Sequence, residues 1–105
     1  MLFKFTFNYA TDFSCIWSWD SEAFDKYGSI VEHKEIGISK ELDLEMQELC
    51  KEYQSSLNWE CPSAPSPWTD EQKQIFTQKA KCVYDKLISE LGEKYQIQYD
   101  VILPK

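Results

Sequence analysis

The chain has 105 residues, 43% of them hydrophobic and 15% aromatic, and a formal net charge of −7; this length and composition indicate one domain around one hydrophobic core. Its eleven basic residues are all lysines, and an acidic chain without arginine repels phosphates, so we expect no nucleic-acid partner. No stretch is long and apolar enough to span a membrane, and residues 1–10 lack the apolar run of a signal peptide, so we expect a cytoplasmic protein without a membrane partner.

Alternation of apolar and polar residues predicts three strands. Residues 2–9 and 13–19 alternate, with a short polar link between them that permits a hairpin, and residues 95–103 alternate again. The apolar sides are, in this order, Phe3, Phe5, Phe7 and Tyr9; Phe13, Cys15, Trp17 and Trp19; and Tyr95, Ile97, Tyr99, Val101 and Leu103. The first and last strands are candidates to be neighbours, although the pattern leaves the strand order open.

Capping residues and helical spacing also predict a short helix after the second strand. This helix is capped by Asp20 or Ser21 and stopped by Gly28. Its spacing directs Phe24 and Tyr27 inward.

Two longer amphipathic helices follow. The first spans about residues 40–53 with Ser39 as its cap, and the second begins at Thr69, whose capping box is completed by Gln72, and ends before Gly92. Their inward stripes are Leu42, Met46, Leu49 and Tyr53, and Phe76, Ala80, Val83, Leu87 and Leu91. The predicted fold is therefore α+β: a small, mainly antiparallel sheet with two amphipathic helices packed on one face, in a single domain over residues 1–105.

The residue types that support catalysis or metal binding form no recognisable motif. His33 is the only histidine and lies in the charged stretch VEHKE, where we expect it on the surface, although a cysteine partner in space stays open. Cys15, Cys50, Cys61 and Cys82 lack the paired spacing of a zinc site and are interpreted as thiols. No glycine-rich loop occurs and no pair of carboxylates stands out, so we expect no enzyme, no metal and no cofactor.

The negative charge is concentrated in the first part of the chain. Residues 12–60 hold twelve acids and four lysines, whereas residues 61–105 hold six of each. On the first of the long helices, Glu41, Glu45, Glu48 and Glu52 recur at i, i+4, i+7 and i+11 and cover about 60° of its surface. This acidic stripe is either a solvated face or a surface that steers a basic protein partner.

The chain has four tryptophans, and each could either fill the core or form part of a contact surface. We expect Trp68, next to a helix cap, to be structural, and Trp59, between Asn58 and Glu60, to be a partly exposed anchor. The candidate partner-binding residues are Trp17, Trp19, Asp20, Glu22, Asp25, Glu41, Glu45, Glu48, Glu52, Trp59 and Glu60.

Three segments of the chain are similar to a known group of proteins. CIWSWDSEAFDKYG, GISKELDLEMQELCKEYQSSLNWECPSAPSPWT and ELGEKYQIQYDV resemble the small acidic immunity proteins of bacterial contact-dependent growth inhibition and polymorphic toxin systems, over roughly Cys15 to Val101. The most recognisable parts are the tryptophan–serine pair, the SLNWECP loop and the leucine–glycine helix end. The resemblance implies tight binding to a cognate toxin domain and its neutralisation, and it carries no interface residue over to this sequence.

Three functions are compatible with these features. The first is an immunity protein that occludes the active site or substrate channel of its toxin, and a nuclease toxin would offer a basic groove to the acidic residues. The second is an acidic interaction module or adaptor unrelated to toxins, which the neighbouring gene would distinguish. The third is an enzyme or ligand-binding protein that uses His33 or a cysteine in a concave pocket. The sequence leaves open the toxin's identity, the stoichiometry and the oligomeric state.

Overall fold

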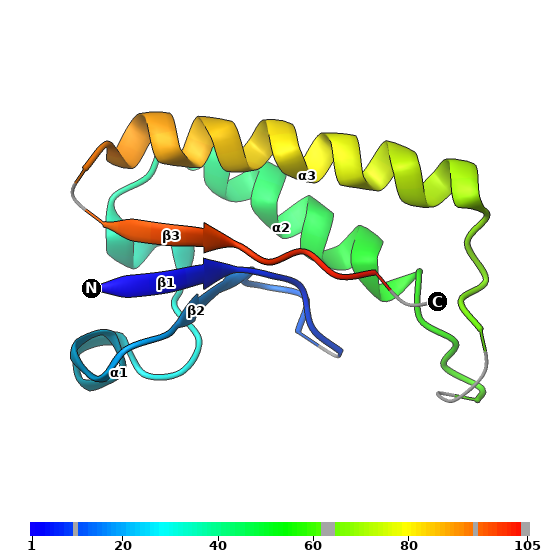
Figure 1. Cartoon of the computed structure of the whole chain (residues 1–105), viewed down its shortest axis with the longest axis horizontal. Helices are drawn as coiled ribbons and strands as arrows, with labels where there is room; N and C mark the ends of the chain where they lie inside the picture. The colour runs from blue at the N-terminus through cyan, green and yellow to red at the C-terminus, as the bar shows by residue number, and fades with distance from the viewer. Residues whose placement is uncertain (10, 62–64, 94, 104–105) are drawn as a thin grey trace.

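The structure is a computed structural model that describes residues 1–9, 11–61, 65–93 and 95–103. Its elements are, in chain order, β1 (Leu2–Phe5), β2 (Ile16–Ser18), α1 (Ser21–Tyr27), the 3₁₀ helix η1 (His33–Ile36), α2 (Lys40–Gln54), α3 (Asp70–Leu91) and β3 (Gln96–Tyr99). Figure 1 shows α2 and α3 together along one side of the sheet, while α1 lies near the beginning of β1. The predicted α+β fold is confirmed.

The sheet is mixed rather than mainly antiparallel. Its order is β2-β1-β3, with Phe3 opposite Ser18 in an antiparallel pair and opposite Ile97 in a parallel pair. The first and last strands are therefore neighbours, as the sequence suggested. Their parallel direction follows from α3, whose 22 residues extend about 33 Å and return the chain to the end of the sheet where β1 begins.

The second strand presents a different face to the helices than its aromatic residues indicate. The pairing places Ile16 and Ser18 on the same side as Phe5 and Phe3, and all four side chains are buried. The predicted inward side of residues 13–19 is confirmed only at Cys15, which is buried just before the strand. The strand covers only Ile16–Ser18; Phe13 and Trp19 are about half exposed, and Trp17 is half-buried. Trp17, the central residue of the strand, pairs with Lys4 and lies on the opposite face of the sheet.

The long helices follow the sequence closely. Ser39 accepts a hydrogen bond from the backbone N–H of Leu42, and Thr69 and Gln72 form the expected capping box. All residues of the two predicted inward stripes are buried; these are Leu42, Met46, Leu49, Tyr53, Phe76, Ala80, Val83, Leu87 and Leu91. In α1, by contrast, Phe24 is exposed, whereas Tyr27 packs against the core as predicted. Ala23 is buried beside it, because residues four apart share one face of a helix.

Candidate functional site

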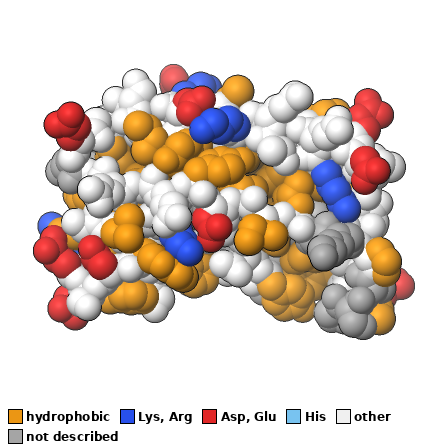
Figure 2. All heavy atoms as spheres, in the orientation of Figure 1, with side chains coloured by type: hydrophobic (Ala, Val, Ile, Leu, Met, Phe, Trp, Pro, Cys, Tyr) orange, Lys and Arg blue, Asp and Glu red, His pale blue; other side chains and the backbone are white. Residues whose placement is uncertain are grey.

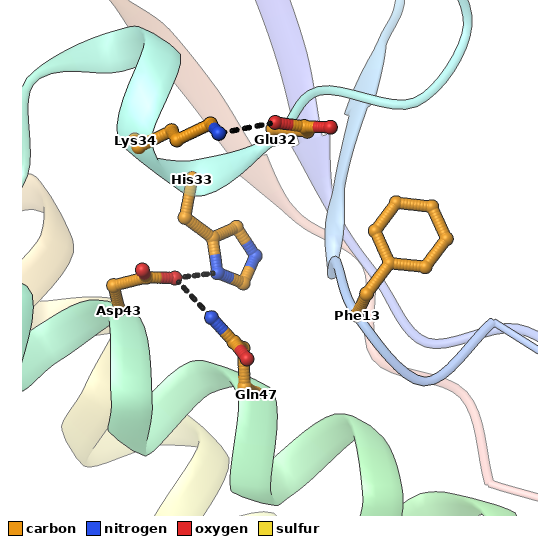
Figure 3. A pocket seen from close by; sticks show the side chains of 6 residues that line it. All are labelled: Phe13, Glu32, His33, Lys34, Asp43 and Gln47. Atoms are coloured by element: carbon orange, nitrogen blue, oxygen red, sulfur yellow. Dashed lines mark hydrogen bonds and ion pairs between the residues drawn. The ribbon is translucent and has the colours of Figure 1, made fainter.

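A histidine is buried where three segments of the chain meet. The side chain of His33 has no exposed surface, and its Nδ1 lies 2.9 Å from Oδ1 of Asp43 on α2 (Figure 3). Its Nε2 accepts a hydrogen bond of 3.2 Å from the backbone N–H of Cys15. Because Nε2 accepts, Nδ1 carries the proton and donates it to Asp43. Burial lowers the pKa of His33, against the opposing effect of Asp43, so the ring is neutral at neutral pH.

The predicted surface position of His33 is wrong, and the 3₁₀ geometry gives the reason. Residues three apart lie on the same side of a 3₁₀ helix, so His33 and Ile36 both face the core. Val31, two residues before His33, is buried as well. Glu32 and Lys34 remain exposed and account for the charged character of the segment. The sequence signal for a buried His33 is therefore its position between two apolar residues, Val31 and Ile36.

Cys15 lies close to this histidine but lacks the properties of a nucleophile. Its Sγ is 3.8 Å from Nε2 of His33, so Cys15, His33 and Asp43 form a row that resembles a cysteine protease triad. Burial raises the pKa of the Cys15 thiol, and a hydrogen bond with Cys50 raises it further. A nucleophilic cysteine needs an exposed thiolate with a lowered pKa, and Cys15 has neither property. The contacts of the row instead hold the start of β2 against η1 and α2.

A pocket opens above the buried histidine. It has a volume of about 320 Å³ and is lined by Phe13, Glu32, His33, Lys34, Asp43 and Gln47. Gln47 donates from Nε2 to Oδ1 of Asp43 over 2.9 Å, so this oxygen accepts from both Gln47 and His33. Sequence reasoning did not find this pocket, because its walls come from three separate segments of the chain: Phe13, residues 32–34, and Asp43 with Gln47 on α2.

Mild acid should destabilise the fold through His33. The folded chain holds the pKa of His33 below its ordinary value of 6.5, so the unfolded chain takes up the proton first as the pH falls. Stability present above about pH 6.5 is then lost as the pH falls through the folded-state pKa. Urea unfolding of the native chain between about pH 8 and about pH 5 should show this slope, and His33→Gln should flatten it. Equal slopes in both proteins would contradict this assignment.

The acidic stripe on α2 is partly neutralised by α3. Glu45 pairs with Lys86 at 3.1 Å, and Glu52 pairs with Lys79 at 3.3 Å. Glu41 and Glu48 are exposed, and no ion pair forms on either among the residues that the structure describes; these two acids are the remaining candidates for external contacts. The cross-helix ion pairs border a shallow groove of about 450 Å³ between the helices; its lining residues are Glu45, Leu49, Ile75, Gln78, Lys79, Cys82, Val83 and Lys86.

A second group of predicted residues surrounds the end of β2. Trp19 is 51% exposed and Nζ of Lys4 lies 3.7 Å from the centre of its ring, while Trp17 is half-buried. Asp20 caps α1, and its hydrogen bond from the backbone N–H of Ala23 lowers the pKa of its carboxyl. Asp20 therefore has a structural role. Glu22 and Asp25 are exposed on α1.

The two tryptophans of the loop after α2 lie as predicted. The ring of Trp68 is 5.2 Å from that of Phe76, and its Nε1 donates to Ser55, so it packs on the core. Trp59 is 49% exposed and its ring lies 4.7 Å from that of Tyr9. Glu60 is exposed beside it, and residues 62–64 of the same loop lie outside the described residues.

The predicted partner-binding residues do not form one surface. Trp17 shares the sheet face of Lys4, opposite the helices, whereas the acidic stripe follows α2 next to α3. Figure 2 shows hydrophobic side chains spread over the visible face, with acidic side chains mostly near its periphery.

A comparison with protein families supports the resemblance found in the sequence. The family model described as Serratia CdiI immunity protein-like matches residues 6–101, which include every helix and all strands except β1. No curated protein matches the chain. Within the described residues, no helix has the length and hydropathy that a membrane crossing requires. Because the match extends over nearly the whole chain, the protein belongs to the Serratia CdiI immunity protein-like family.

Proposed function

We propose that this protein is the cytoplasmic immunity partner of a CdiA toxin domain, which it binds and neutralises by occluding the active site or the substrate channel. The family match over residues 6–101 is the observation that carries the proposal. The toxin domain is expected to be basic at the contact.

The charge distribution supports a basic partner. The whole acidic excess lies in residues 12–60, which supply Glu41 and Glu48 on α2 and Glu22 and Asp25 on α1. Exposed charges at the rim of an interface mainly raise the association rate, whereas half-exposed aromatic rings such as Trp19 and Trp59 slow dissociation once they are desolvated.

Protection of cells tests this function. The C-terminal domain of the effector encoded next to the gene should stop growth when it is expressed alone, and co-expression of this chain should restore growth. A toxin domain from an unrelated system is the control and should remain toxic. If the chain protects from neither toxin, the alternative of an acidic module unrelated to toxins is favoured instead.

Salt should slow the formation of the complex. Between about 50 mM and about 500 mM salt, the association rate constant with the toxin domain should fall about tenfold or more, while the dissociation rate constant changes little. Stopped-flow fluorescence of the tryptophans measures both rates. An association rate that does not depend on salt would exclude a contact between acidic and basic surfaces.

A further inference from the structure

We propose that the pocket formed by Phe13, Glu32, His33, Lys34, Asp43 and Gln47 receives an arginine side chain of the partner protein. The identity of the partner rests on the proposed function, whereas the chemistry of the pocket is argued from its own residues. The site lies on the opposite side of α2 from the glutamates that pair with α3, so it is distinct from the acidic stripe.

The floor of the pocket holds the carboxylate of Asp43, and the lysine of the pocket, Lys34, pairs with Glu32 instead. Burial lowers the pKa of His33, and its Nε2 accepts from the backbone N–H of Cys15, so the ring is neutral; no lysine pairs with Asp43 among the residues that the structure describes. Asp43 uses Oδ1 for both of its hydrogen bonds, from His33 and Gln47. Within the described part of the chain, Oδ2 of Asp43 and Oε1 of Gln47 have no hydrogen-bond donor, and both are strong acceptors.

The rim of the pocket suits a planar cation. Phe13 is 48% exposed at the edge, where its ring face can stack on a guanidinium. Glu32 pairs with Lys34 at 3.4 Å, but both side chains are mostly exposed, and such pairs are weak. Lys34 can therefore move aside and leave Glu32 to an incoming cation.

Size and rigidity favour arginine as the occupant. A volume of about 320 Å³ corresponds to roughly ten water molecules at liquid density, which is enough for a long side chain. The hydrogen bonds of His33 and Gln47 hold Asp43 in place before binding, so little entropy is lost in ordering the acceptors. An arginine fork can bond two fixed acceptors and stack at once, which the ammonium of lysine cannot do.

A small-molecule probe tests the pocket without the toxin. N-acetyl-arginine amide should give saturable NMR shifts at the side-chain amide of Gln47 and the backbone amides of Phe13 and residues 32–34. The isosteric, neutral N-acetyl-citrulline amide should bind at least about tenfold more weakly. Asp43→Asn keeps an oxygen that can accept from His33 and should weaken arginine binding by about tenfold, whereas Lys34→Ala should strengthen it. Equal binding of both probes, or no effect of Asp43→Asn, would overturn the proposal.

The complex with the toxin domain separates this proposal from the proposed function. Asp43→Asn should lower the affinity about tenfold or more, and Phe13→Leu several-fold, with unchanged melting temperatures. Asp85→Asn removes the same charge from exposed α3 and should leave the affinity unchanged. If the native chain binds the toxin and Asp43→Asn binds equally well, the pocket proposal fails and the function stands. If the native chain binds the arginine probe but not the toxin, the function fails and the pocket stands.

Discussion

Phe76→Ala is expected to lower the free energy of unfolding by about 3–5 kcal/mol, the largest effect of any single truncation that we predict. Phe76 has no exposed surface, and its ring centre lies 5.1 Å from that of Phe7, 5.2 Å from that of Trp68 and 6.3 Å from that of Tyr53. It thus joins α3 to the chain after β1, to the end of α2 and to the loop that follows. Removing the ring leaves a cavity that all three segments would have to close together.

The neighbouring residue gives a matched control for this truncation. Ile75 lies on the same helix but is 45% exposed, so Ile75→Ala should cost no more than about 1 kcal/mol. Urea unfolding, monitored by circular dichroism and tryptophan fluorescence, measures both variants. Equal losses of stability for the two substitutions would show that the aromatic cluster does not hold these segments together.

The long helices could be predicted because their signals are local. Ser39 and Thr69 cap within three residues, and the periodicity of the buried stripes needs no partner to be recognised. Local signals also identified Gly28 and Gly92 as helix ends. The match of the family model to nearly the whole chain agrees with the resemblance found in the residues themselves.

The errors concern features that depend on distant parts of the chain. The face of β2 is decided by its register with β1, where Phe3 meets Ser18, and a shift of one residue reverses the inward side. The parallel direction of β3 depends on where α3 ends. The burial of His33 depends on Asp43 and on the backbone of Cys15, neither of which is marked by its neighbours in sequence.

The charge of the acidic stripe also depends on distant parts of the chain, so the sequence alone could not predict it. The spacing of the four glutamates was evident, but the cations that neutralise two of them lie 27 and 41 residues further along the chain, at Lys79 and Lys86. A charge pattern in the sequence therefore overstates the charge that a partner meets, because the fold supplies counter-ions of its own.

Reversal of the stripe is expected to have the largest effect on binding, with an affinity for the toxin domain that falls about 100-fold or more. Each Glu→Lys substitution adds two positive charges, so reversal at Glu41, Glu45, Glu48 and Glu52 takes the net charge from −7 to about +1. The fold should survive, because the two exposed cross-helix ion pairs contribute no more than about 1 kcal/mol each. Isothermal titration at low salt measures the affinity, and circular dichroism checks the fold.

Two smaller variants separate the position of the charges from their sum. Glu41→Lys with Glu48→Lys reverses only the acids without an internal partner among the described residues and should account for most of the loss in affinity. Glu45→Lys with Lys86→Glu exchanges the two members of one ion pair, so the net charge and the pair are both retained, and binding should change little. If the exchange weakens binding as much as the double reversal does, then the toxin contacts the groove between α2 and α3 directly. If neither variant alters the affinity, the stripe is only a solvated face and the basic surface of the toxin is met elsewhere.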